Sequence, residues 1–182
     1  AALRACAAHG VQKRWRRALR LVREAPEAAD ARCFTSAIRA CAADGRWREA
    51  LGLLRRLELS NVSAPSAHAY SAAISALRPS AKWRTAVALL GRMRSSGLAL
   101  DAHCLGAALE VCAAADRWEE TLSLVGSMPR LGLTPSSRHL APMLRCCTRA
   151  GHCAEALAML DRLGRPPLDA VATAAALEAC AR

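Results

Sequence analysis

Apolar residues recur at helical spacing along this chain, in pairs of amphipathic segments joined by a short turn. In the clearest pair, the first apolar stripe consists of Phe34, Ala37, Ile38 and Cys41. The turn Ala43-Asp44-Gly45 ends this segment. A second stripe follows, formed by Trp47, Ala50, Leu51, Leu54 and Leu57. The pattern therefore predicts a unit of two amphipathic helices.

The spacing of the tryptophans indicates that this unit repeats. Trp15, Trp47, Trp83 and Trp118 are separated by 32, 36 and 35 residues. Three and four residues after each comes a small residue and then an apolar one, which gives the pairs Ala18-Leu19, Ala50-Leu51, Ala86-Val87 and Thr121-Leu122. A further step of 35 residues reaches Cys153, which Ala156-Leu157 follows at the same offsets. We therefore expect about five repeats.

Cysteine marks a second repeated position. Cys6, Cys41, Cys112 and Cys147 lie 35 or twice 35 residues apart, Leu77 fills the vacant place, and Cys180 follows 33 residues after Cys147. A small buried thiol suits a close approach of two helices. The weaker alternative is a metal site at Cys146, Cys147, His152 and Cys153, which lack paired CxxC spacing. The odd total of nine cysteines favours free thiols in a reducing compartment.

Start signals precede the first helix of each unit. They are the dipeptides Pro65-Ser66, Leu100-Asp101, Pro135-Ser136 and Leu168-Asp169, whose second residue suits an N-cap. One helix pair cannot bury its apolar stripe alone, so neighbouring pairs must stack. The prediction is an all-α, right-handed superhelical α-solenoid that forms one array over residues 1–182. Its repeats are expected at 1–30, 31–66, 67–101, 102–136 and 137–169, with a partial repeat at 170–182.

The charge balance narrows the class of partner. Lys and Arg number 26 against 15 Asp and Glu, which gives a formal net charge of +11. Residues 1–56 carry 13 basic and 5 acidic side chains, or +8, which leaves +3 for the rest. Such a surface favours a polyanion or an acidic protein. No apolar run approaches the roughly 20 residues of a membrane span, so no span is expected.

Several stretches resemble the pentatricopeptide repeat family. They are residues 36–41, 45–51, 70–76 and 92–101. A tetratricopeptide array has a similar period, but its aromatic pattern on the first helix is absent. The resemblance covers essentially the whole chain, and it begins and ends inside a repeat. We therefore expect the chain to be part of a longer array.

The resemblance implies an organellar binder of single-stranded RNA, in a mitochondrion or chloroplast, that reads about one base per repeat. The expected partner is single-stranded or structured RNA. In the family, the fifth residue of the first helix and the last residue of the repeat select the base. By register, these pairs are Thr35 with Ser66, Ser71 with Asp101, Gly106 with Ser136, and Ala141 with Asp169. Of these, Ser71 with Asp101 resembles a combination associated with guanine.

The second residue of the first helix packs against the base in this family, which prefers a small aliphatic side chain there. The residues at this position are Arg32, His68, His103 and Arg138. Arg and His could stack on bases or contact phosphates, or they could be solvated or contact a protein. Gly106 and Ala141 carry no hydrogen-bonding side chain, so their repeats depart from the family's base-reading mode. Stacking contributes about 1 to 3 kcal/mol per base and association costs at least about 4 kcal/mol, so four such repeats would bind free RNA weakly.

Motifs for catalysis are absent from the sequence. There is no phosphate-binding GxxxxGK[ST] loop, no HExxH zinc helix and no nucleophile with a base at motif spacing. We therefore expect neither an enzyme nor a cofactor, metal or small-molecule substrate. The alternative to RNA binding is a scaffold within a large organellar complex, such as a ribosome, photosystem or respiratory assembly. It would contact partner subunits through second-helix residues such as Arg48, Arg55, Arg84 and Arg92, but we favour RNA binding.

Overall fold

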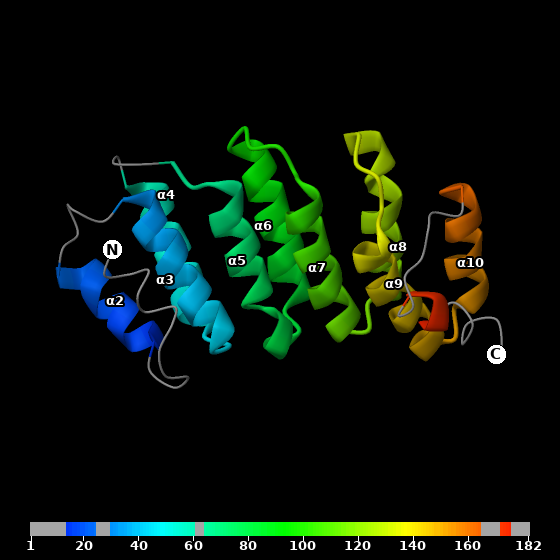
Figure 1. Ribbon diagram of the computed structural model, residues 1–182, viewed down its shortest axis with the longest axis horizontal. Coiled ribbons are helices and arrows are strands. Elements are labelled where there is room, and N and C mark those ends of the chain that lie inside the picture. Colours follow the sequence, from blue (N-terminus) through cyan, green and yellow to red (C-terminus); the bar gives the residue numbers. More distant parts are fainter. Residues whose placement is uncertain (1–13, 25–29, 61–63, 165–171, 176–182) are drawn as a thin grey trace.

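The computed structural model describes residues 14–24, 30–60, 64–164 and 172–175. Over these ranges the chain is helical with no β-strand, and its helices stand side by side along the long axis of the molecule (Figure 1). The helices are α2 (Arg14–Glu24), α3 (Ala31–Ala43), α4 (Trp47–Leu59), α5 (Ala67–Ser75), α6 (Trp83–Ser95), α7 (Ala102–Ala114), α8 (Trp118–Ser127), α9 (Ser137–Ala150) and α10 (Cys153–Arg162). Short 3₁₀ turns lie at Arg78–Ser80 and Pro129–Leu131.

The helices form two layers, as the predicted helix pairs require. The first helices α3, α5, α7 and α9 contact one another in this order, each with its neighbour. The second helices α4, α6 and α8 each contact both their own first helix and the one that follows. Each pair thereby buries its apolar stripes against its neighbours. The predicted all-α repeat solenoid is confirmed.

Capping residues fix where the first helices begin. Asp30, Ser66 and Asp101 are the N-caps of α3, α5 and α7. Their side chains accept hydrogen bonds from the backbone N–H groups three residues later, at 2.8, 3.4 and 2.7 Å. Ser136 caps α9 through a capping box. The N-cap prediction holds for Ser66, Asp101 and Ser136, whereas Asp169 lies outside the described residues.

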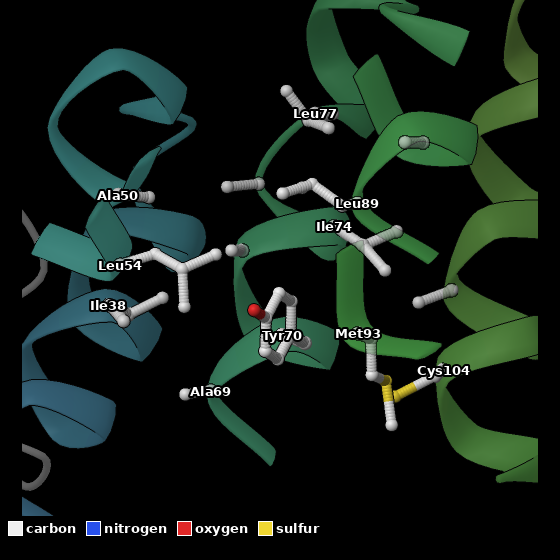
Figure 2. Close-up of a cluster of buried hydrophobic side chains, with 14 of the residues drawn as sticks. Ile38, Ala50, Leu54, Ala69, Tyr70, Ile74, Leu77, Leu89, Met93 and Cys104 are labelled. Carbon is white, nitrogen blue, oxygen red and sulfur yellow. The ribbon is translucent and has the colours of Figure 1, made fainter. Parts of the chain in front are cut away.

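Small and branched apolar residues fill the space between the layers. Figure 2 shows Ile38 and Leu54 on one side of Tyr70 and Ile74, with Met93 and Cys104 on the other. These side chains come from α3 to α7, so one core runs through successive repeats. A separate cluster of buried residues from α7 to α10 continues the array. Alanines at the contacts, such as Ala37, Ala50 and Ala86, are fully buried and let the helix axes approach closely.

The repeated cysteine position is a packing position. Cys41, Cys112 and Cys147, together with Leu77 at the same place in the repeat, have 0% of their surface exposed. Burial raises the pKa of each of these three thiols to about 12, with nearby acidic groups or a thiolate adding to the effect. They therefore stay protonated at neutral pH and behave as small apolar groups. Cys6 and Cys180 fall outside the described residues.

The turn inside each repeat needs one residue with left-handed backbone geometry. It comes two residues before the second helix and is Gly45, Ala81, Asp116 or Gly151, with φ values of 65, 49, 52 and 79°. Glycine adopts this conformation without a steric penalty, whereas the Cβ atoms of Ala81 and Asp116 make it strained. The sequence revealed this position only at Gly45.

Two kinds of feature are absent from the described ranges. No helix there is long and apolar enough to cross a membrane. No group of three or more His, Cys, Asp or Glu side chains comes together as a metal site there. That includes the cluster of Cys146, Cys147, His152 and Cys153.

Candidate nucleic-acid interface

The second residue of each first helix lies exposed at its N-terminal turn. These residues are Arg32, His68, His103 and Arg138. Because α3, α5, α7 and α9 pack against one another in order, the four side chains recur once per repeat along one layer (Figure 1). We call these four residues the first-turn row. None of them makes an ion pair with a described acidic residue.

The fifth residues of the same helices lie deeper. Thr35 is half-buried, and its hydroxyl donates to the Ala31 carbonyl at 2.7 Å. Ser71, Gly106 and Ala141 are buried where one first helix meets the next. The predicted base-selecting residues and the first-turn row therefore share the same helices but differ in depth. The first-turn row is open to a ligand, whereas most fifth residues contact only protein.

Ser71 differs from the other fifth residues because its hydroxyl is buried without a hydrogen-bond partner. The residue is 2% exposed, and Oγ has no hydrogen-bond partner in the structure. The neighbouring Cys104 thiol instead donates to the Ala67 carbonyl at 3.4 Å. Burial, with the Asp101 carboxylate second, raises the pKa of this thiol to about 12. An orphaned polar group in a close-packed layer is uncommon and indicates a role beyond packing.

The last residues of the repeats serve as caps. Asp101 Oδ1 accepts from the Cys104 N–H, which leaves the second carboxylate oxygen outside the cap. Ser66 accepts a longer bond of 3.4 Å from the Ala69 N–H. Ser136 interacts with His139 Nδ1 through both its N–H, at 3.1 Å, and its Oγ, at 2.9 Å. Base recognition at these positions would therefore share atoms with helix capping.

His139 was not predicted as a site residue, and it links two repeats. It is 4% exposed. Its Nδ1 accepts the Ser136 N–H, so Nε2 carries the proton and donates to the Ala102 carbonyl of the preceding first helix at 2.9 Å. The bonds require a neutral ring with a fixed tautomer. Its place three residues after a Ser N-cap was the one signal in the sequence.

A ladder of cations and tryptophans runs along the second-helix N-termini. Arg46 lies over the Trp15 ring at 4.8 Å, Lys82 over Trp47 at 4.6 Å, and Arg117 over Trp83 at 4.7 Å. His152 continues the series by stacking on Trp118. We call these four pairs the cation–tryptophan ladder. Arg46, Lys82, Arg117 and His152 each come immediately before the second helix of the next repeat, so this position is a periodic signal in the sequence.

The arginines expected to contact partner subunits have contacts within the chain. Arg48 and Arg84 lie over their neighbouring rings, Trp47 and Trp83, at 5.0 and 4.8 Å. Arg92 pairs with Glu58, which also accepts a 2.7 Å hydrogen bond from the Tyr70 hydroxyl. Arg55 is exposed on α4. Of these four arginines, Arg92 joins two repeats, whereas Arg48 and Arg84 contact the ring of the preceding residue in the same helix.

Comparison with known proteins settles the family. The model described as PPR repeat matches residues 32–62, 68–98 and 142–165. The chain is a pentatricopeptide repeat protein. No curated protein matches it. The family matches leave out residues 99–141, which contain Gly106 and His139.

Solved pentatricopeptide repeat structures share the fold. The maize protein PPR10, in complex with an 18-nt psaJ RNA element, matches with a TM-score of 0.76 and 26% identity over 96% of this chain. This chain spans 26% of the length of that protein. The PPR domain of Arabidopsis thaliana protein-only RNase P 1, in complex with tRNA, matches with a TM-score of 0.75 and 14% identity, over 92% of this chain and 91% of that one. The A. thaliana nuclear proteinaceous RNase P 2 (PRORP2) matches with a TM-score of 0.66 and 17% identity. The match covers 81% of this chain and 34% of that one.

Proposed function

We propose that this pentatricopeptide repeat chain binds single-stranded RNA along its first-helix layer, as an RNA-binding module rather than an enzyme. The observation that carries the proposal is the first-turn row. Arg32, His68, His103 and Arg138 are exposed at one repeated position, directly above the residues that select bases in the family. The RNA in the PPR10 and PRORP1 structures supports it by analogy.

The first-turn row supplies the general affinity. An arginine or protonated histidine contacts phosphate or stacks on a base without reading its identity. The excess of 26 basic over 15 acidic residues adds attraction at longer range. This part of the interaction tolerates changes of base and weakens as salt rises.

Ser71 and Asp101 supply the selectivity. Ser71 Oγ is unpartnered, and Asp101 keeps one carboxylate oxygen outside its cap. Guanine offers adjacent N1–H and N2–H donors on its Watson–Crick edge, and a carboxylate with a hydroxyl offers acceptors to match. This pair therefore favours guanine over bases that lack two adjacent donors.

The size of the array limits the affinity of these repeats alone. Stacking on a few bases, at about 1 to 3 kcal/mol each, barely exceeds the cost of association. Further repeats, or tethering to a larger assembly, would raise the effective concentration. We propose that the chain acts in this way in RNA metabolism or translation in a mitochondrion or chloroplast, as the family does.

A scaffold role in an organellar complex is the second candidate. The exposed Arg55 and the 74% exposed Leu59 on α4 favour a protein contact there. The internal contacts of Arg48, Arg84 and Arg92 argue against the wider second-helix surface that this role requires. RNA binding therefore explains more of the exposed repeated positions.

Crosslinking of the native protein in cell extract, with RNA and peptides sequenced together, tests both candidates. RNA binding predicts short tags joined to positions between 35 and 141, which disappear in an Arg32→Ala, Arg138→Ala double variant. The matched control is Arg55→Ala, Arg94→Ala, which removes two exposed second-helix charges and should retain the tags. Peptide crosslinks to a fixed set of subunits without enriched RNA would make the protein a scaffold.

A further inference from the structure

The third residue of a first helix fits against the preceding first helix in a repeated contact. Cys104 and His139 occupy this position in α7 and α9, and both are buried. Cys104 Sγ donates to the Ala67 carbonyl and His139 Nε2 to the Ala102 carbonyl. Both contacts span 37 residues, so the thiol and the imidazole occupy equivalent places, which we call the third-position slot.

The side chain in the slot decides how much room remains for the fifth residue of the preceding repeat. The small Cys104 lies beside Ser71, whose hydroxyl affects the thiol's pKa. The larger His139 lies over Gly106. A Cβ atom at position 106 would be 3.4 Å from His139 Nε2 and 3.5 Å from Cδ2. A Cβ there would be in van der Waals contact with the imidazole, so side-chain atoms that extend from it toward α9 would meet the ring.

His139 does not replace the reader that it displaces. Its Nδ1 is bound to Ser136 and its Nε2 to Ala102, so both ring nitrogens are used. With both nitrogens engaged within the protein, the ring presents no free donor or acceptor to a base. Ser136, the other half of the expected pair, has its N–H and Oγ engaged with the same ring. Both halves of the base-selecting pair are thus closed by one side chain.

We propose that His139 is a plug that makes the repeat 102–136 accept any base, so that selectivity is concentrated at the neighbouring repeat of Ser71 and Asp101. This rests on the proposed RNA binding and adds its specificity pattern. The plug would act as a positioning residue. The repeat would still hold one nucleotide, so that the register of the RNA on the array is kept, but it would not select the base of that nucleotide.

Binding of the wild-type chain to a set of short RNAs, each with one position changed to all four bases, tests the proposal. We expect one nucleotide, held by Ser71 and Asp101, at which the preferred base binds at least about 5-fold more tightly. The adjacent nucleotide on the 102–136 side should vary by less than about 2-fold. Ser71→Ala should remove the first preference and retain overall binding.

Two variants test whether His139 causes the lack of base selectivity at the repeat 102–136. Gly106→Ser alone should gain no selectivity, because the imidazole still covers the position. Gly106→Ser with His139→Ala should create a base preference at the nucleotide that was unread. Thermal melting reports whether each variant is folded, and the wild-type measurement decides the question if the double variant is not.

The outcomes separate the two proposals. A strong base preference of the wild type at the 102–136 nucleotide overturns the plug and leaves RNA binding intact. A gain of selectivity from Gly106→Ser alone does the same. Absence of binding to every RNA in the set at low salt overturns the proposed function, and the plug with it.

Discussion

Lys82 Nζ lies 4.6 Å from the centroid of the Trp47 ring, so that the start of one second helix is joined to the start of the next. The same relationship recurs at Arg46 with Trp15 and at Arg117 with Trp83. Each pair connects two repeats at the outer layer, where the Arg92–Glu58 ion pair also joins α6 to α4. The ladder therefore couples neighbouring repeats in addition to the buried core.

The coupling within the ladder is measurable. In a double-mutant cycle of Lys82→Ala and Trp47→Ala, the interaction energy in urea unfolding should be about 0.5 to 1 kcal/mol, as for an exposed cation over an aromatic ring. A cycle of Arg55→Ala with Trp47→Ala is the control. Arg48 and Lys82, not Arg55, lie over the Trp47 ring, so the interaction energy of this control pair should be near zero. Equal values in the two cycles would show that the ladder contributes nothing specific.

Relief of the strained turn at Ala81 should stabilise the protein. Ala81 has φ of 49°, whereas the equivalent residue in the first complete repeat is Gly45. Ala81→Gly should raise the free energy of unfolding by about 1 kcal/mol, because the Cβ penalty of the left-handed conformation is removed. Ala88→Gly, at an exposed position within α6, should lower it by about 0.5 to 1 kcal/mol. A melting temperature that falls in both variants would contradict the expectation.

Alkaline pH should destabilise the fold through its buried thiols. The folded-state pKa of Cys41, Cys112 and Cys147 is raised to about 12 from an ordinary value near 9. Because the folded pKa is the higher one, the stabilising contribution is complete below about pH 9 and is lost as the pH rises toward 12. The free energy of unfolding should therefore fall between pH 9 and 10.5. Cys41→Ala should show a shallower fall than the wild type, and parallel profiles would refute the assignment to this thiol.

Salt dependence should separate the first-turn row from the rest of the basic surface. For single-stranded RNA, each phosphate contact contributes about 0.7 to the slope of log K against log salt concentration. Arg32→Ala with Arg138→Ala should therefore lower the slope by about 1.4, measured by fluorescence anisotropy with a labelled RNA. The exposed pair Arg55 and Arg94 on the second helices serves as the control, and its removal should change the slope little. Equal changes would place the RNA elsewhere.

The periodic features of the sequence were sufficient for the fold. The spacing of Trp47, Trp83 and Trp118, with a small residue three positions after each, predicted the helix pairs. A second helix begins at each of these tryptophans in the structure. The N-cap residues Ser66 and Asp101 placed the first helices correctly. Local propensity and apolar period suffice here because every contact in a repeat array is made with a neighbour in sequence or in the next unit.

Part of the candidate interface could also be predicted. The exposed first-turn positions of Arg32 and Arg138 follow from register alone, since the second residue of a first helix lies before the buried stripe begins. The burial of Ser71 and the absence of a hydrogen-bond partner for its hydroxyl could not be predicted. They depend on how closely α5 and α7 approach, which the side chains of both helices decide together.

The sequence by itself determined the repeat, its helices and its caps, because helix and cap signals are local to each segment and recur with the period of the repeat. The tertiary structure decided that His139 covers Gly106 and that Lys82 reaches Trp47. Both relationships join side chains from successive repeats. The Lys82–Trp47 contact recurs in other repeats, whereas the contact of His139 with Gly106 has no periodic signature. They depend on the volume and direction of single side chains at a packed contact, where one imidazole or one missing Cβ determines which atoms meet.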